Sequence, residues 1–209
     1  MLKYLIIGDS HVPKRAQSVS NLILEKLDEL TANELFEHTF FTGDLIDYSQ
    51  FMEYLNLKTK KNLFVVIGNM DYYYGNKNAP VYQKSELILK DNNKLVIGLT
   101  HGAQIEPRGD RIQLEYLAKE RGYNILISGH THKEEIFLTK NSILLLNPGS
   151  VTGAWSFVAS KIPSFIVMTL DEISNHIDIS LYQLDKNTQQ VKELKFYFIF
   201  ENSKIKHRY

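Results

Sequence analysis

Short apolar runs recur along the first two-thirds of the chain, and a Gly, Asp, Asn or His follows each of them closely. Apolar runs of this length, bounded by turn residues, are typical of strands buried inside a protein. We therefore predict five strands in this part of the chain: Tyr4–Ile7, Thr39–Thr42, Leu63–Ile67, Leu95–Thr100 and Ile125–Ser128.

Helical patterns separate these strands. In the first two patterns the apolar residues share roughly one face, and they are Leu22, Leu24, Leu27 and Leu30, and then Phe51, Met52, Tyr54 and Leu55. The third pattern contains Ile112, Leu114, Tyr116 and Leu117. Gly122 follows the third pattern and predicts its end. Strands that alternate with helices predict βαβ crossovers and a mostly parallel sheet.

From Glu134 onward the pattern changes to consecutive β-type segments. These are Ile136–Leu138, Ile143–Leu146, Phe165–Leu170, Ile177–Leu184 and Val191–Phe200. The order of the two patterns predicts an α/β fold with two sheets that share one core. We expect residues 1–200 to form a single domain and the polar tail, 201–209, to be frayed.

Composition narrows the class of protein. The length of 209 residues, with 44% hydrophobic and 23% charged residues, fits one globular domain and excludes wholesale disorder. A formal net charge of zero disfavours binding to nucleic acid. The chain has no Cys, which excludes disulfides and thiolate metal sites. It has no apolar stretch of about 20 residues and no signal peptide, so we expect no direct membrane insertion.

Polar side chains gather where the five predicted strands end. They are Asp9, His11, Asp44, Asn69, Asp71, His101, His130 and His132. The carboxyl ends of parallel strands meet at one edge of a sheet, so these groups should lie together. Imidazoles and carboxylates are ligands of divalent transition metals, and so many of them imply two ions rather than one.

A single His or Asp at a strand end is more often a turn former than a metal ligand. However, four of the seven His residues lie at such ends, which argues against chance. The remaining three, His38, His176 and His207, do not lie at the carboxyl ends of these predicted strands.

The order of these motifs resembles that of the calcineurin-like metallophosphoesterase superfamily. Its pattern of D-x-H, GD-x-x-D, GN-H-[DE], H and GH-x-H has counterparts in Asp9–His11, Gly43–Asp47, Gly68–Asp71, His101 and Gly129–His132. The resemblance implies a four-layer α/β/β/α sandwich and up to two divalent ions such as Mn or Zn. It assigns Asp9, His11, Asp44 and His132 to one ion. It assigns Asp44, as the bridging ligand, with Asn69, His101 and His130 to the other.

One position departs from the superfamily pattern. Met70 stands where the superfamily has a His that protonates the leaving group or grips the phosphate. A thioether has no proton to give and is a weak acceptor. The loss of a general acid typically costs 10²–10⁴-fold in rate. We therefore expect metal binding to be retained and turnover to be weak or absent, with no catalytic residue assigned.

The second half of the chain is similar to the family of small subunits of the retromer endosomal coat. The similar segments include Ile125–Lys133, Asn147–Ala154 and Pro163–Phe165. The resemblance implies a scaffold in endosome-to-Golgi or plasma membrane protein transport. It also implies a cytoplasmic location, peripheral on endosomal membranes, with a large α-solenoid subunit and endosomal regulators as partners. Animal members have Asn and Asp at the positions of Asp44 and Asn69, whereas this chain keeps the residues of the enzymes.

The partner surfaces are also expectations. In this family the loop after His101 faces the solenoid subunit, so we expect Ile105 and Pro107 to be its apolar anchors, although this loop also carries Glu106 and Arg108. We place Leu2 and Tyr182 on a different, regulator-binding surface. The alternative function is an active metal-dependent phosphodiesterase of the bacterial type, favoured by the unbroken ligand set. A metal-sensing or phospho-ligand-binding module is a third possibility.

Overall fold

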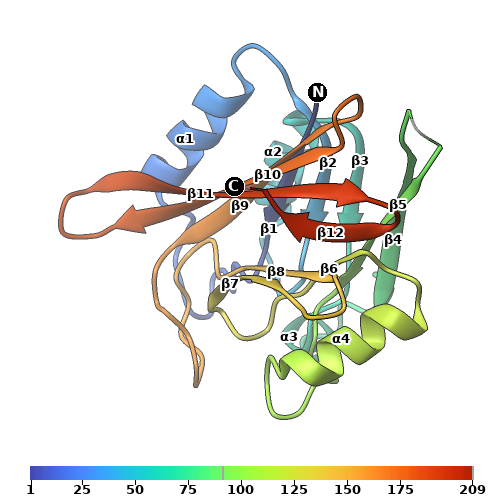
Figure 1. Cartoon of the computed structure of the whole chain (residues 1–209). Helices are drawn as coiled ribbons and strands as arrows, with labels where there is room; N and C mark the ends of the chain where they lie inside the picture. The colour runs from blue at the N-terminus through green and yellow to red at the C-terminus, as the bar shows by residue number, and fades with distance from the viewer. Residues whose placement is uncertain (91, 209) are drawn as a thin grey trace.

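The apolar runs fold into two β-sheets that pack face to face. The structure is a computed structural model that describes residues 1–90 and 92–208. Helices α1 and α4 lie on opposite sides of the pair of sheets (Figure 1). Twelve strands and four helices are present among the described residues.

The large sheet has seven strands in the order β12-β11-β10-β9-β1-β2-β3. Three strands from the first third of the chain, β1, β2 and β3, run parallel to one another. The other four extend the sheet on the far side of β1 as antiparallel neighbours. The bounds of these strands are β1 Leu2–Ile7, β2 Phe36–Phe41, β3 Thr59–Val65, β9 Ser164–Asp171, β10 His176–Asp185, β11 Gln190–Glu201 and β12 Lys204–His207.

The small sheet has five strands in the order β4-β5-β6-β8-β7. Its three central strands, β5, β6 and β8, are parallel, and an antiparallel strand flanks them on each side. The bounds are β4 Tyr82–Ile88, β5 Lys94–Thr100, β6 Ile125–Ile127, β7 Glu134–Leu138 and β8 Leu144–Pro148. Both sheets are thus mixed, and the parallel character predicted from the strand–helix alternation is confined to three strands in each.

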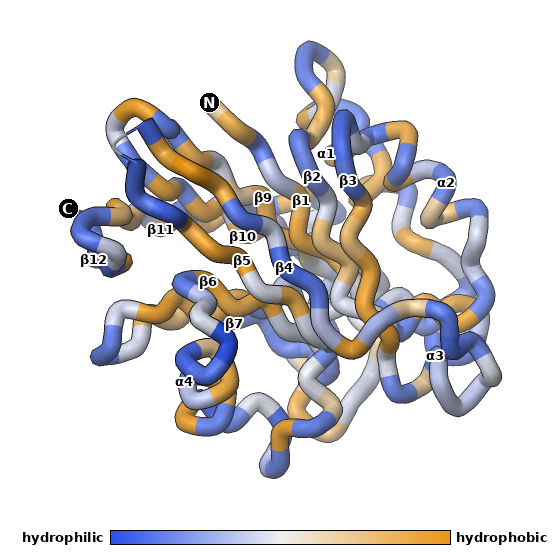
Figure 2. The backbone as a smooth tube through the Cα atoms, turned by 90° about the vertical axis from the view of Figure 1, so that its right-hand side faces the viewer, coloured by the Kyte–Doolittle hydropathy of each residue, from blue (hydrophilic) through white to orange (hydrophobic). Residues whose placement is uncertain are grey.

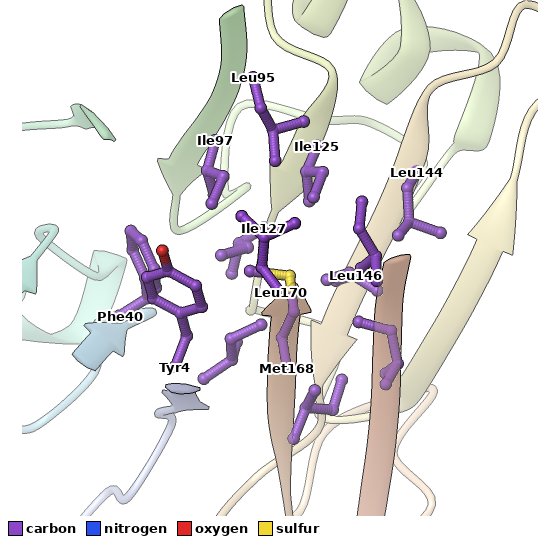
Figure 3. Close-up of a cluster of buried hydrophobic side chains, with 14 of the residues drawn as sticks. Tyr4, Phe40, Leu95, Ile97, Ile125, Ile127, Leu144, Leu146, Met168 and Leu170 are labelled. Atoms are coloured by element: carbon purple, nitrogen blue, oxygen red, sulfur yellow. The ribbon is translucent and has the colours of Figure 1, made fainter. Parts of the chain in front are cut away.

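The main core lies between the two sheets. Successive residues of a strand point to opposite faces, so Tyr4 and Ile6 of β1 face the small sheet while Leu5 and Ile7 face the helices. Figure 3 shows Ile97, Ile127 and Leu146 meeting the side chains of the large sheet, and Figure 2 shows hydrophobic residues concentrated along the central strands. The expectation of two sheets with one shared core is confirmed.

Helices cover the outer faces of both sheets. The helices α1, Asn21–Thr31, and α2, Ser49–Leu57, cover the large sheet. The helix α4, Arg111–Glu120, covers the small sheet through Leu114 and Ala118. This arrangement is the predicted α/β/β/α sandwich. A single turn, α3 (Asn69–Tyr73), follows β3. No helix within the described residues is long and apolar enough to cross a membrane.

Three details differ from the expectations. Of the four apolar residues in the helical pattern of α4, Ile112 and Tyr116 are exposed, although such a pattern usually marks a buried face. The strand β4 was not predicted, since only one of its residues, Ser85, is buried and its sequence lacks an apolar pattern. The expectation of a frayed tail is wrong for residues 204–207, because β12 pairs with β11 and buries Ile205 in the main core, and Tyr209 lies outside the described residues.

Candidate metal centre

The predicted site residues meet at one end of the sandwich. Three of the strand ends that carry them belong to the large sheet, namely those of β1, β2 and β3, and two belong to the small sheet, those of β5 and β6. We expected these residues to meet at the edge of one sheet, but strand ends of both sheets contribute them. The site lies across the junction of the sheets rather than on one of them.

One group of four buried side chains converges on a single point. The ligand atoms of Asp9, His11, Asp44 and His132 all lie within 4.8 Å of one another. The Nε2 atoms of His11 and His132 are 2.9 Å apart. The nearest carboxylate oxygens are Asp44 Oδ2, 3.2 Å from His11 Nε2, and Asp9 Oδ1, 3.4 Å from His132 Nε2. This group matches the first predicted ligand set.

The second predicted set lies beside the first and is centred on His101. Its Nε2 atom is 3.0 Å from Asn69 Oδ1 and 3.2 Å from His130 Nδ1. The same atom is 3.5 Å from Asp44 Oδ2. Asp44 Oδ2 thus lies between His11 of the first group and His101 of the second, which is the position of a bridging carboxylate.

Backbone carbonyls orient two of the imidazoles. His132 donates from Nδ1 to the carbonyl of Ala154 at 2.9 Å, and His101 donates from Nδ1 to the carbonyl of Thr42 at 2.8 Å. In each ring this bond leaves the lone pair of Nε2 facing the centre. Such a bond to the outer nitrogen is the usual support of a metal-binding His.

The backbone of the site is held in an uncommon conformation. Five of the site residues have positive φ angles between 50° and 68°, and they are Asp9, His11, Asp44, His130 and His132. Residues other than Gly rarely adopt this conformation, and each costs of order 1–3 kcal/mol, which the surrounding structure must offset. Such strain is concentrated at functional sites, and here it coincides with the converging side chains.

Two glycines allow the loops to approach one another. A Cβ atom at Gly68 would lie 1.9 Å from Asp44 Oδ1, and a Cβ atom at Gly129 would lie 2.4 Å from Asp9 Oδ2. Any side chain at these positions would displace a carboxylate of the centre. The Gly that precedes Asn69 and the Gly that precedes His130 are therefore required by the geometry of the site.

Asp71 has a structural role instead of facing the centre. Its carboxylate accepts hydrogen bonds from the backbone N–H groups of Asp44 at 2.7 Å, Ile46 at 2.8 Å and Gly68 at 3.0 Å. The Asp71 carboxylate therefore holds the turn that contains Asp44 against the start of α3. The Met70 N–H donates to Asp44 Oδ1 at 2.8 Å, which completes the support of that side chain.

Burial and ion pairing set the pKa values of the side chains at the centre. Burial lowers the pKa values of His11 and His130 to about 3, so both rings are neutral at physiological pH. Burial opposes protonation of His132 as well, but its bond with Asp9 and the charge of that carboxylate outweigh burial and raise its pKa. Burial raises the pKa of Asp44, and neighbouring Asp9 adds to this effect.

These residues fit a divalent metal ion. Neutral imidazole lone pairs and carboxylate oxygens that converge in a buried space are the donor set that Zn²⁺ or Mn²⁺ accepts. Two nitrogens that face each other at 2.9 Å beside two carboxylates are compatible with a cation placed among them. A bound ion at this position would supply a Lewis acid for a phosphoryl oxygen and lower the pKa of a bound water.

The expected partner-binding residues lie in different environments. Ile105 is only 5% exposed and packs under α4, so little of its side chain is open to a partner, and its role as an anchor stays a prediction. Tyr182 is buried, stacks on Phe165 and donates to Glu193, so it offers little surface to a partner. Pro107 is exposed and Leu2 is half-buried. Their roles in partner binding stay predictions.

Sequence reasoning missed two residues that support the centre. Thr42 donates from its hydroxyl to Asp9 Oδ2 at 2.8 Å and accepts from His101 through its carbonyl. Ala154 holds His132 through its carbonyl. The backbone carbonyl of any residue can accept such a hydrogen bond, so no sequence signal marks Ala154. Thr42 adjoins the Gly-Asp motif after β2, which is the one signal that could have indicated it.

Comparison with known proteins agrees with this geometry. Residues 2–172 match the model of the calcineurin-like phosphoesterase superfamily domain. The chain belongs to this superfamily. A curated relative in Methanocaldococcus jannaschii, named a probable metallophosphoesterase, is 37% identical over 147 residues, which are 70% of this chain and 67% of the relative.

Solved structures extend the similarity beyond the superfamily domain. Vacuolar protein sorting 29 from Cryptosporidium parvum is 30% identical, with a TM-score of 0.79 over 95% of this chain and 98% of that one. The Zn²⁺ complex of wild-type Vps29 from Entamoeba histolytica is 28% identical, with a TM-score of 0.78 over 94% of this chain and 99% of that one. The chain thus has a metallophosphoesterase fold of the kind found in Vps29, with a buried Asp/His group able to hold a metal ion.

Proposed function

We propose that this protein is the small, scaffolding subunit of a retromer-type coat. In this proposal it docks on a large α-solenoid subunit and binds endosomal regulators during transport from endosomes to the Golgi or the plasma membrane. It acts in the cytoplasm, peripheral on endosomal membranes through the complex. The metal ligands are the seven predicted residues, Asp9, His11, Asp44, Asn69, His101, His130 and His132.

The correspondence with Vps29 along nearly the whole chain carries the proposal. The similarity includes the β-rich second half of the chain, beyond the end of the superfamily match at residue 172. Met70 also supports a non-enzymatic role, because its side chain cannot donate a proton to a leaving group. A metal ion would then serve to order the loops that form the docking edge.

An apolar hollow close to the loop predicted for this contact supports docking of the solenoid subunit there. Ile105 lies at its floor, and Ile112, Tyr116 and Leu117 of α4 line it, with a volume of about 390 Å³. The side chain of Ile112 is 78% exposed. Interfaces of this kind centre on a few apolar or aromatic anchors with a polar rim. Pro107 lies in the loop that leads into α4 and would extend the contact.

The test is recovery of a helical-repeat partner by the tagged protein from cytosol. We expect Ile112→Asp to abolish recovery of the large subunit, because it places a charge in the hollow without touching the core. The matched control is Ile173→Asp, since Ile173 is 74% exposed in the turn between β9 and β10. Equal recovery by both variants would show that this hollow is not the docking site.

A metal-dependent phosphodiesterase is the second candidate function. The observation that favours it is the set of converging ligands, including Asp44 in the bridging position. Purified protein with Mn²⁺ would then hydrolyse bis(p-nitrophenyl) phosphate, and His130→Ala would abolish the activity. Under the scaffold proposal hydrolysis is faint, and Met70→His raises it by about 10²-fold. Robust hydrolysis by the wild-type protein would contradict the scaffold proposal.

A further inference from the structure

A cavity lies behind the loop that carries two of the candidate metal ligands. Its volume is about 190 Å³, roughly a dozen times the space that one water molecule requires. Several segments of the small-sheet half of the molecule line it. Its polar lining residues are Arg108, Ser128, Thr131, Lys133, Glu135 and Asn147. Leu114 and Val158 supply apolar walls.

One hydroxyl in the wall of this cavity is free to bind a ligand. Ser128 follows β6, lines the cavity and is only 6% exposed, yet its hydroxyl forms no hydrogen bond with any described residue. Its neighbours are satisfied: Thr131 Oγ1 accepts from Lys133 N at 3.1 Å and from Asn147 Nδ2 at 3.0 Å. The Ser128 oxygen is not among the fully buried polar atoms that lack a partner, so it faces the open space of the cavity, where it can donate to a ligand.

The charges around the cavity favour an anion. Arg108 and Lys133 both line it, and neither forms an ion pair within residues 1–90 and 92–208. The one carboxylate of the lining belongs to Glu135, which Arg111 already binds with two nitrogens at 2.8 and 2.6 Å. Two unpaired cations therefore remain beside a hydroxyl donor. This set matches the charge and the acceptor oxygens of a phosphate group.

We infer that this cavity is a phosphate-binding site, separate from the metal centre and formed by Arg108, Lys133 and Ser128. The segment from Gly129 to Lys133 is shared by the two sites: His130 and His132 turn toward the metal centre, and Thr131 and Lys133 line the cavity. The loop of Arg108 packs against this segment, because a Cβ atom at Gly109 would lie 2.8 Å from Thr131 Cγ2.

The test is calorimetric titration of the full chain with inorganic phosphate after its metal has been removed by a chelator. We expect binding to persist without metal. Ser128→Ala and Arg108→Gln should each weaken it by about tenfold or more, because each removes a hydrogen bond to a charged group. Arg15→Gln is the matched control. The charge of Arg15 acts to lower the pKa values of His11 and His132, but Arg15 does not line the cavity, so this substitution should leave phosphate binding unchanged.

Thermal unfolding gives a second readout. The Ser128 hydroxyl has no protein partner, so Ser128→Ala should keep the melting temperature of the phosphate-free protein while losing the increase that phosphate causes in the wild type. O-phosphoserine in place of inorganic phosphate distinguishes the source: comparable affinity indicates a phosphate carried on a side chain, and selective binding of inorganic phosphate indicates the free ion. Both results support the site. Binding that requires metal, or that is unaffected in both cavity variants, overturns it.

Discussion

Asp71 fixes the turn of Asp44 through three backbone N–H groups. We predict that Asp71→Asn lowers the free energy of unfolding by about 2–3 kcal/mol, because the amide keeps one acceptor oxygen and its NH₂ group faces a buried N–H. Urea unfolding in the presence of chelator measures this change. The control is Asp47→Asn in the same segment, where the side chain is exposed and the change should stay within about 0.5 kcal/mol. Similar effects of both variants would contradict the role of Asp71.

The buried imidazoles predict a pH dependence of stability. Folded His11 and His130 have pKa values of about 3, below the value of about 6.5 for an unfolded His. The unfolded state thus binds more protons than the folded state between these values, and stability falls as the pH falls below 6.5. The raised pKa of His132 acts in the opposite direction.

As the pH falls, the neutral rings of His11 and His130 destabilise the folded protein and His132 stabilises it. We therefore expect the free energy of unfolding of the metal-free protein to fall by of order 2 kcal/mol between pH 7 and pH 5. Denaturant unfolding at the two pH values measures the loss. His11→Gln should reduce the loss, since it removes one of the two rings that must stay neutral. A metal-free protein equally stable at both pH values would contradict the burial of neutral imidazoles at the centre.

The site residues were more predictable than the roles of the residues around them. Asp9, His130 and His132 were found because each follows a short apolar run and the runs become parallel strands. The role of Asp71 was not predictable, since a carboxylate that binds backbone N–H groups has the same sequence signature as one that binds metal. The burial of Ile105 was not predictable either, because the burial of a loop residue depends on the element that packs against it, here α4.

Strand β12 joins the end of the chain to both sheets. It pairs with β11, and Ile205 donates from its N–H to the carbonyl of Ser142, in the turn between β7 and β8. We predict that Ile205→Ala lowers the free energy of unfolding by about 2–4 kcal/mol, because its side chain is 1% exposed in the main core. Chemical denaturation measures the loss. Lys206→Ala, on the exposed face of the same strand, should change the stability by less than about 0.5 kcal/mol.

Elements were predictable where burial gives them an apolar pattern. The central strands β1, β5 and β6 are buried, and their runs were recognised in the sequence. The strands β4 and β12 lie at sheet edges and have mainly polar sequences, so their pairing is visible only in the structure. Ile112 and Tyr116 belong to the same apolar pattern as Leu114 but are exposed, because an exposed apolar residue of a helix has the same sequence signature as a buried one.

A bound metal ion would link the two sheets of the molecule. Its proposed ligands come from the large sheet through Asp9 and Asp44 and from the small sheet through His132. We predict that chelation lowers the melting temperature, since an ion present at 100 times its dissociation constant stabilises the folded state by about 2.7 kcal/mol. Differential scanning calorimetry with Zn²⁺ and with chelator measures the shift.

His132→Ala is the control for this experiment. It removes one of the four converging ligands, and its melting temperature should respond much less to chelation than that of the wild type. An identical curve for the wild type with saturating metal and with chelator would contradict a metal that holds the two sheets together.

The central position of β1 has a consequence for the synthesis of the protein. One edge of this strand pairs with β2, but its other edge pairs with β9, where Leu2 lies opposite Leu170. At 5–20 residues per second, the ribosome needs about 8 to 32 s to deliver that partner after β1 has been made. The nascent chain therefore carries an open, apolar strand edge through most of its translation, which is the kind of edge that chaperones must shield from other chains.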